Sequence, residues 1–271
     1  MAAAPGAVRI AKLSEVADYR ACQEVQRRAW SLQEDGYIVP VATLAAVNKY
    51  GGLVLGAWRN EQLVGFAFGF LGRLQGDLIL YSQLTAVLPQ EQGEGLGYAL
   101  KAGQREWARA EGLATIAWAF DPMQAGNANF NLHRLGAHCR IYTPDMYGER
   151  RDALNAQLSS TDRLIAEWKV TSPTSASSEI KLEDCQPALI TVRHKLAEAR
   201  QAISLKLPTI KAGPLCLEIP ENINLLSAEQ AQLWQALIRQ ACQSLFGLGY
   251  IIVDFVRRDE PNERRGWYLL S

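Results

Sequence analysis

The most constraining feature of the sequence is residues 78–107, where an apolar run, a glycine-rich segment and an amphipathic run follow one another. The apolar run ends at Pro89, as a buried strand is expected to do. Five residues then recur at helical spacing along one face, and polar residues fall largely on the opposite face. The stretch therefore predicts a strand, a glycine-rich turn and a helix. The first face carries Leu96, Ala99, Leu100, Gly103 and Trp107, and the other carries Lys101, Gln104, Arg105 and Arg109.

Such a turn directs several backbone N–H groups to one spot in front of the positive end of the helix dipole, where phosphate binds. Its glycines let the backbone approach a ligand closely. Two familiar phosphate fingerprints do not fit this segment. The chain has no Gly-x-x-x-x-Gly-Lys-Ser/Thr string, and the dinucleotide pattern Gly-x-Gly-x-x-Gly fails at Leu100.

A third pattern, Gln/Arg-x-x-Gly-x-Gly, fits the hexamer Gln92-Gly93-Glu94-Gly95-Leu96-Gly97, which follows Val87-Leu88-Pro89. This segment resembles the acyl-CoA loop of the GNAT acyltransferase superfamily. A plain tight turn is the alternative, because glycine-rich turns are common. The strand expected before the hexamer and the helix expected after it favour the acyl-CoA loop.

The elements expected up to residue 170 have an order similar to that of a complete GNAT domain, with the glycine loop after the fourth strand. We therefore expect an α/β (α+β) fold of the GNAT type, in which helices flank a mixed, mostly antiparallel central sheet. The expected strands are residues 8–10, 53–58, 63–71, 78–87, 113–120, 138–142 and 163–170. The expected helices are residues 14–30, 41–50, 96–107 and 127–135, the last closed by Gly136.

The sequence predicts a second folded region after this domain. Residues 171–178 are small and polar, as is typical of a linker. We divide the chain into a GNAT domain (1–170), a linker (171–180) and a small C-terminal α+β domain (181–271) that packs on the first. In the C-terminal domain a capping box at Ser227 opens a helix that ends at Gly247. Strands are expected at 188–192, 215–219, 250–256 and 267–270.

Composition excludes several classes of protein. Lys+Arg and Asp+Glu both number 28, so no net field recruits nucleic acid or an anionic membrane. The five cysteines include no Cys-x-x-Cys and the three histidines show no ligand spacing, so we expect neither a disulfide framework nor a metal. No signal peptide is recognised, and no apolar run approaches the ~20 residues of a membrane span. We expect a cytoplasmic protein with neither nucleic acid nor membrane as a partner.

The resemblance implies a set of cofactor-binding residues for acetyl-CoA. In GNAT enzymes the glycine loop holds the pyrophosphate, the backbone of the fourth strand pairs with the pantetheine arm, and an Asn after the fifth strand contacts that arm. The residues implied for the arm are Thr85, Ala86 and Val87, with Asn127 and Asn129 near the displaced Asn position. Those implied for the pyrophosphate are Gln92, Gly93, Glu94, Gly95, Leu96, Gly97 and Tyr98.

Residues 120–137 resemble the segment Asn-x-x-Ala…Tyr-x-x-Leu-Gly-Phe of the family but depart from it at one position. The family's Tyr protonates the leaving thiolate, and Leu132 stands there instead. Leucine cannot donate a proton, so a substitute acid is needed. Tyr147 is the first candidate and Tyr142 the second, because loop residues carry function more often than core residues do. Packing is the alternative for both.

Three further polar residues lie near the expected site. Ser82 and Gln83 occupy the central strand, where the family often places a base or a water-holding group. A polar strand position that faces solvent explains them equally well. Asp121 follows a strand and precedes a proline, which favours a turn or cap over a contact with a substrate ammonium.

Two functions of different class follow from the resemblance. The first is an N-acetyltransferase that moves an acetyl group from acetyl-CoA directly to the amine of a small-molecule acceptor. The second is an acyl-CoA-binding protein of the same fold without turnover, which Leu132 keeps open. A third hypothesis makes the C-terminal region an assembly module through the Trp234 and Ile238 face, although that face is better suited to covering its own sheet. A homodimer is left open.

Overall fold

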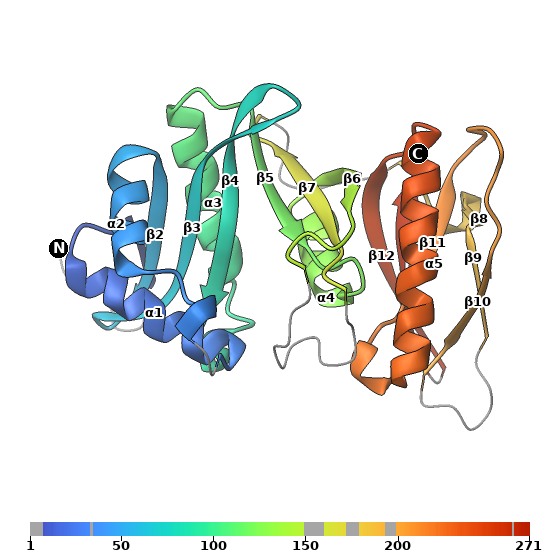
Figure 1. Cartoon of the computed structure of the whole chain (residues 1–271), viewed down its shortest axis with the longest axis horizontal. Helices are drawn as coiled ribbons and strands as arrows, with labels where there is room; N and C mark the ends of the chain where they lie inside the picture. Colours follow the sequence, from blue (N-terminus) through green and yellow to red (C-terminus); the bar gives the residue numbers. More distant parts are fainter. Residues whose placement is uncertain (1–7, 33–34, 149–159, 172–178, 193–198, 262) are drawn as a thin grey trace. The chain divides into compact units, whose positions relative to one another are not determined.

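The computed structural model describes residues 8–32, 35–148, 160–171, 179–192, 199–261 and 263–271 (Figure 1). By their contacts the residues form two compact units. The first unit is Met1–Trp118 with Lys169–Thr171, and the second is Ala119–Trp168 with Ser172–Ser271. The domain boundary expected from the sequence near residue 170 stays a prediction. Most of the predicted linker, residues 172–178, lies outside the described residues.

The first unit contains a mixed sheet in the order β1-β2-β3-β4-β5. The pairs up to β3–β4 are antiparallel, whereas β4 and β5 are parallel. The predicted order of strands and helices is confirmed, as is the mixed, mostly antiparallel sheet. The strands are β1 (Val8–Lys12), β2 (Gly52–Arg59), β3 (Gln62–Leu74), β4 (Asp77–Val87) and β5 (Thr115–Phe120). The helices are α1 (Val16–Trp30), α2 (Val41–Tyr50) and α3 (Leu96–Ala110), with 3-10 turns η1 (Asp35–Tyr37) and η2 (Pro89–Glu91).

Helices cover both faces of this sheet, with α1 drawn in front of the strands and α3 behind them in Figure 1. Glycine lets α3 approach closely, because a Cβ at Gly103 would lie 2.8 Å from Leu55 on β2. A buried amide fixes α2 in place. Asn48 donates to the backbone of Leu13 at 2.7 Å and to the Tyr19 hydroxyl at 2.8 Å. Its oxygen also accepts from the Val54 N–H, so one side chain ties α2 to α1 and β2.

The sheet strands of the second unit follow one another in the order β7-β6-β12-β13-β11-β8, and β9 and β10 form a separate two-stranded sheet. Ser227 caps α5 by accepting from the Gln230 N–H, as its capping box predicts. β8 and β10 are not among the predicted strands. The elements are α4 (Ala125–Ala128), the π-helix η3 (Asn129–Arg134), β6 (His138–Thr143), β7 (Arg163–Lys169), η5 (Leu182–Asp184), β8 (Gln186–Pro187), β9 (Leu189–Val192), β10 (Gln201–Leu205), β11 (Leu215–Ile219), η6 (Ile223–Leu225), α5 (Ala228–Gly247), β12 (Ile252–Glu260) and β13 (Glu263–Leu270).

C-terminal strands complete the core around residues 119–168. β12 packs on η3 and pairs with β6 through Ile252 and Cys139. The buried Tyr268 hydroxyl donates to the Pro122 carbonyl at 2.7 Å. Residues 119–168, which the sequence assigns to the GNAT domain, thus share a core with the C-terminal region.

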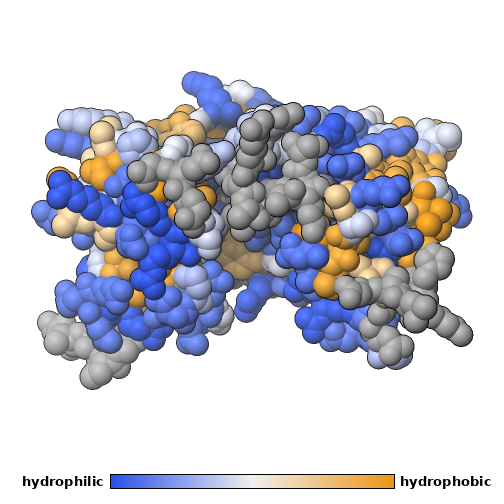
Figure 2. Space-filling model, turned by 60° about the horizontal axis from the view of Figure 1, so that its bottom comes forward, coloured by the Kyte–Doolittle hydropathy of each residue, from blue (hydrophilic) through white to orange (hydrophobic). Residues whose placement is uncertain are grey.

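The surface shown in Figure 2 is largely hydrophilic, with apolar residues in separate patches. None of the helices within the described ranges combines the length and apolar character that crossing a membrane requires.

Candidate functional site

The glycine loop of the first unit has the geometry of an anion cradle. Gly93 and Gly95 adopt left-handed backbone angles, with φ of 89° and 79°. An L side chain is strained at such angles, which explains glycine at both positions. α3 begins at Leu96, and its first helical bond joins the Ala99 N–H to the Gly95 carbonyl. The N–H groups of its first turn therefore have no partner within the helix and point toward the loop.

Side chains at the start of the loop anchor it to the sheet. The Gln92 amide donates to the Val87 carbonyl at 3.1 Å, which ties the loop back to the end of β4. Arg59 and Glu91 form an ion pair at 2.9 Å just before the loop. Residues Gln92, Gly93, Glu94 and Gly95 are themselves exposed. The cradle is thus held at its base and open to solvent at its rim.

Beside this loop β4 separates from β5. The two strands pair only at Leu80 with Ile116 and Tyr81 with Ala117. β4 then continues to Val87, still paired on its other side with β3. A bulge at Gln83 marks the place of divergence, since Leu84 and Ser82 oppose consecutive residues of β3. The edge of β4 facing β5 therefore carries no ladder from β5 along its last residues, which include Thr85, Ala86 and Val87.

A buried polar cluster lies under α3 at this divergence. The Lys101 ammonium donates to the Ser82 hydroxyl at 2.8 Å and lies 3.7 Å from the centroid of the Trp118 ring. Ser82 in turn donates to the Gln104 side-chain oxygen at 2.8 Å. All three polar residues are buried. Burial lowers the pKa of Lys101 from 10.5 to about 7, because desolvation disfavours the charged amine.

Two atoms near this cluster lack hydrogen bonds among the described residues. They are the Thr85 hydroxyl and the Gln104 side-chain nitrogen, both buried. The Gln104 nitrogen lies beside Gly69 of β3. Buried polar groups are normally satisfied, so an unsatisfied Thr85 hydroxyl on the strand with the open edge is informative. It is the situation expected where a polar ligand completes the bonding.

The sequence places Lys101 and Gln104 on the face of the helix opposite the apolar one, and the structure shows that both are nevertheless buried. Arg105 is buried as well, and donates to the Val170 carbonyl at 2.8 Å. The helix is covered on two sides, so its polar stripe also faces protein. A signal was present in the sequence, because Lys101, Gln104, Arg105 and Ala108 recur at the spacing of a second buried face.

The predicted catalytic residues of β4 occupy different environments. Ser82 is buried and bonded to Lys101 and Gln104, whereas Gln83 is exposed at the bulge. One of the two interpretations expected Ser82 to face solvent. The structure shows that it does not. The roles assigned to both residues stay predictions.

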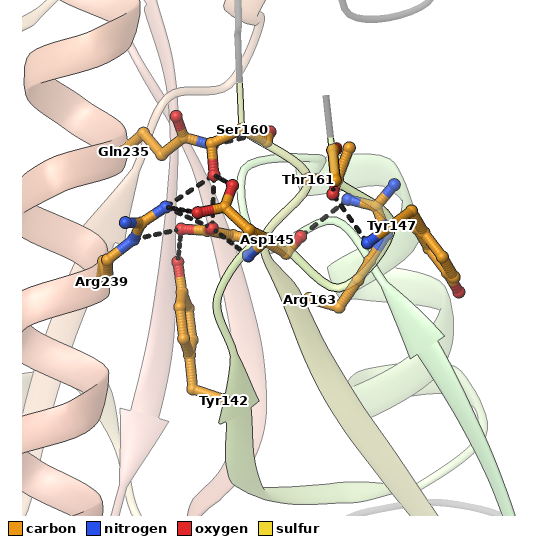
Figure 3. A network of polar contacts seen from close by, with 10 residues as sticks. Tyr142, Asp145, Tyr147, Ser160, Thr161, Arg163, Gln235 and Arg239 are labelled. Atoms are coloured by element: carbon orange, nitrogen blue, oxygen red, sulfur yellow. Dashed lines mark hydrogen bonds and ion pairs between the residues drawn. The ribbon is translucent and has the colours of Figure 1, made fainter. Parts of the chain in front are cut away.

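Tyr142 and Tyr147 belong to the second unit, Tyr142 on β6 and Tyr147 in the loop after it (Figure 3). Tyr147 is 42% exposed, its ring lies 5.2 Å from the Arg163 guanidinium, and its N–H donates to Thr161 at 2.9 Å. Tyr142 instead donates its hydroxyl to Asp162 at 2.6 Å. Burial followed by this carboxylate contact raises the pKa of Tyr142. Tyr142 is thus engaged in structure, and Tyr147 is the freer phenol.

Asp162 is the centre of a polar network with Tyr142, Ser160 and Arg239, three residues that Figure 3 labels. The carboxylate is buried and accepts two bonds from Arg239, at 2.8 and 2.6 Å, and one from Ser160 at 2.6 Å. Burial raises its pKa, but the bonds from Arg239, Ser160 and Tyr142 outweigh burial and leave the pKa lowered. A hollow of about 720 Å³ beside the network is lined only by residues of the second unit, Asp145 and Gln235 among them.

The remaining predicted residues also lie in the second unit. Asn127 is exposed at the end of α4, and Asn129 is half-buried at the start of the π-helix. Their contact with CoA stays a prediction. Leu132 is fully buried, so the position of the family's acid is a core position in this chain. The Asp121 carboxylate accepts from the Met123 N–H at 2.8 Å, as the turn interpretation expects. Within the described ranges no group of ligating side chains suits a metal ion.

No family model matches the sequence, and no curated protein matches it. Solved structures similar to the chain include an acetyltransferase assigned to the GNAT family from Desulfovibrio desulfuricans, at 18% identity and a TM-score of 0.48, covering 61% of this chain and 100% of that one. Another is the ribosomal-protein-S18-alanine N-acetyltransferase of Escherichia coli, at 19% identity and a TM-score of 0.48, covering 65% and 100%. A third, from Salmonella typhimurium and solved with acetyl-CoA, has 19% identity and a TM-score of 0.49, covering 64% and 99%.

Proposed function

We propose that this protein is an N-acyltransferase that uses acetyl-CoA as the acyl donor and a small-molecule amine as the acceptor. The observation that carries the proposal is the placement of an exposed glycine cradle at the end of a strand whose neighbouring edge is unpaired. The cradle suits a pyrophosphate, and the edge at Thr85–Val87 suits a pantetheine arm, whose amides pair like a peptide.

In the proposed reaction the acceptor nitrogen attacks the thioester carbon directly. The C–N bond forms as the C–S bond breaks, the electron pair leaves with sulfur, and the nitrogen loses one proton. The cradle and strand edge hold the donor in place, which is a large part of what positioning contributes to such a transfer. Gln83, exposed at the bulge, is proposed to hold a water near the reacting carbon, and Asn127 and Asn129 to contact the arm.

Tyr147 remains the acid proposed from the sequence. Its exposed side chain supports that role, since the phenol is accessible. A second function, acyl-CoA binding without turnover, is favoured by one observation. Leu132 is buried where the family has its proton donor.

Calorimetric titration with acetyl-CoA tests the cradle. Gly97 lies in the first turn of α3 without a left-handed angle, so Gly97→Val adds bulk at the cradle without backbone strain. We expect the variant to fold and to lose affinity for acetyl-CoA. A matched control is Gly36→Val, which lies on η1 with no atom within 4 Å of the added Cβ. Unchanged affinity in a folded Gly97→Val variant would contradict the assignment. A second assay, which measures the release of CoA from acetyl-CoA in the presence of a panel of amines, separates turnover from binding.

A further inference from the structure

A buried ammonium lies at the closed end of the opening between β4 and β5. Ser82 and Trp118 are the first residues beyond the last β4–β5 pair on their strands. Lys101 contacts both, at 2.8 Å to the hydroxyl and 3.7 Å to the ring centroid. Among the described residues the Ser82 hydroxyl is its hydrogen-bond partner. No other acceptor among the described residues takes up the remaining N–H donors of the ammonium.

The direction of a bound donor follows from the order of elements, given the proposed function. The pyrophosphate lies at the loop after β4, so the pantetheine arm runs back along the strand from Val87 to Thr85. The next residues in that direction are Leu84, Gln83 and Ser82. The sulfur is at the far end of the arm from the pyrophosphate. The arm therefore brings the thioester toward the closed end of the opening, where Ser82 and Lys101 lie.

We propose that Lys101 supplies the proton taken up by the leaving CoA sulfur, and that the Ser82 hydroxyl passes it on. As the C–S bond breaks, sulfur takes the electron pair and accepts the hydroxyl proton of Ser82. Ser82 recovers a proton from the Lys101 ammonium, which becomes a neutral amine. Lys101 then regains the proton that the acceptor nitrogen has lost, through solvent, so the cycle balances.

The acidity of Lys101 suits this transfer. Its pKa of about 7 lies below the ~8.5 of an ordinary thiol, so the proton moves downhill to sulfur. A lysine with its usual pKa of 10.5 would retain the proton. Burial alone causes the shift. Charged residues of the strands and helix around Lys101 lie at or near strand ends or along α3 itself: Arg9, Lys12, Arg59, Arg73, Asp77, Arg105, Glu106 and Arg109.

The resting hydrogen bonds leave this path open. The Ser82 hydroxyl donates to Gln104 in the absence of ligand, but a hydroxyl rotates freely about its C–O bond and can turn toward another acceptor. The Thr85 hydroxyl lies on the strand whose edge is open and has no hydrogen-bond partner among the described residues, so it is available to a ligand that enters the opening.

Acetyl transfer from acetyl-CoA to hydroxylamine tests the proposal in the full-length chain. Hydroxylamine is neutral around pH 7 and needs no base, so the pH profile of acetohydroxamate formation reports on protonation of the leaving group. We expect the wild-type rate to fall as pH rises through about 7, where Lys101 loses its proton. Lys101→Met should lower the low-pH rate by roughly 10²-fold and remove this pH dependence. Lys101→Arg keeps the charge but cannot donate near pH 7, so its profile should also be flat.

Ser82→Ala retains Lys101 and should lose rate without loss of folding, which keeps the test valid if a Lys101 variant fails to fold. Lys12→Met, at an exposed position on β1, is the matched control and should behave as wild type. Calorimetry should give the same affinity for CoA in all variants. Absence of CoA binding in the wild-type chain overturns the proposed function. CoA binding combined with a wild-type rate and profile in Lys101→Met overturns the role of Lys101 alone. CoA binding without any turnover in the wild-type chain overturns both the role of Lys101 and the proposed acyl transfer.

Discussion

The Lys101 ammonium donates to the Ser82 hydroxyl at 2.8 Å, and both side chains are buried beneath α3. An ammonium removed from water is unfavourable unless it is paired with a charge or becomes neutral. Here the partner is a neutral hydroxyl and the neighbouring ring offers only its face. The lowered pKa of Lys101 is the consequence, and it makes the stability of the first unit depend on pH.

The first prediction concerns the sign of that dependence. The pKa of Lys101 is about 7 in the folded chain and 10.5 in the unfolded chain, so between these values the unfolded state binds more protons. The free energy of unfolding therefore rises with pH across this window. Below the window Lys101 is charged in the folded chain, and the full cost of burying that charge lowers the stability. We expect Lys101→Met to be more stable than wild type below pH 7, by roughly 2–4 kcal/mol. Urea unfolding at several pH values should show the difference shrinking toward pH 10.5, with Lys12→Met as the control.

The second prediction concerns the network of the second unit (Figure 3). Arg239 makes two hydrogen bonds to the buried Asp162 carboxylate, so Arg239→Ala leaves that charge without its main partner. We expect a loss of about 3–5 kcal/mol in the free energy of unfolding. Arg264→Ala removes an arginine from an exposed ion pair and should change stability by less than about 1 kcal/mol. Similar losses in both variants would show that the Asp162 network adds nothing special.

The same carboxylate gives this prediction a pH dependence. Since the pKa of Asp162 is lowered on folding, its contribution is present above the unfolded pKa and is lost as pH falls through the folded one. The advantage of wild type over Arg239→Ala should therefore narrow in acid.

The third prediction separates the two candidate proton donors. If Lys101 supplies the proton, Tyr147→Phe should leave kcat for acetyl transfer near the wild-type value. If the phenol is the acid, kcat should fall by roughly 10²–10⁴-fold with little change in affinity for acetyl-CoA. Steady-state rates on one acceptor, at a pH where chemistry limits turnover, distinguish these outcomes. Tyr37→Phe, at an exposed position on η1, controls for loss of a surface phenol.

Features that are local in sequence were predictable, and those that depend on tertiary packing were not. The turn at Gly93 and Gly95 was predictable because glycine is the residue that best suits its left-handed angles. The helix start at Ser227 was predictable because a capping box involves only the cap residue and the residue three positions later, Gln230. Lys101 was missed because a helical wheel assumes one buried face, whereas α3 is covered on two sides. The β4 bulge at Gln83 and the short strand β8 depend on pairing with distant residues, which the spacing of side chains does not reveal.

The last prediction concerns a variant that ends at Val170. The GNAT resemblance alone suggests that such a chain is a complete domain. In the structure, however, residues 119–168 share a core with the C-terminal region, through the pairing of Cys139 with Ile252, the bond from Tyr268 to Pro122 and the packing of β12 on η3. Truncation removes these partners and exposes core positions such as Leu132, which is fully buried in the intact chain.

We therefore expect the truncated chain to lose the cooperative unfolding of residues 119–168 and to aggregate, because buried apolar surface that is returned to water costs about 25 cal/mol per Å². Hydrogen exchange should show protection in β2 and β3 but not in β6. Co-expression with a second fragment, residues 171–271, is the control, and should restore protection of β6 if the C-terminal strands are what it needs. A soluble, cooperatively folded chain ending at Val170, with β6 protected, would instead establish residues 1–170 as an independent domain.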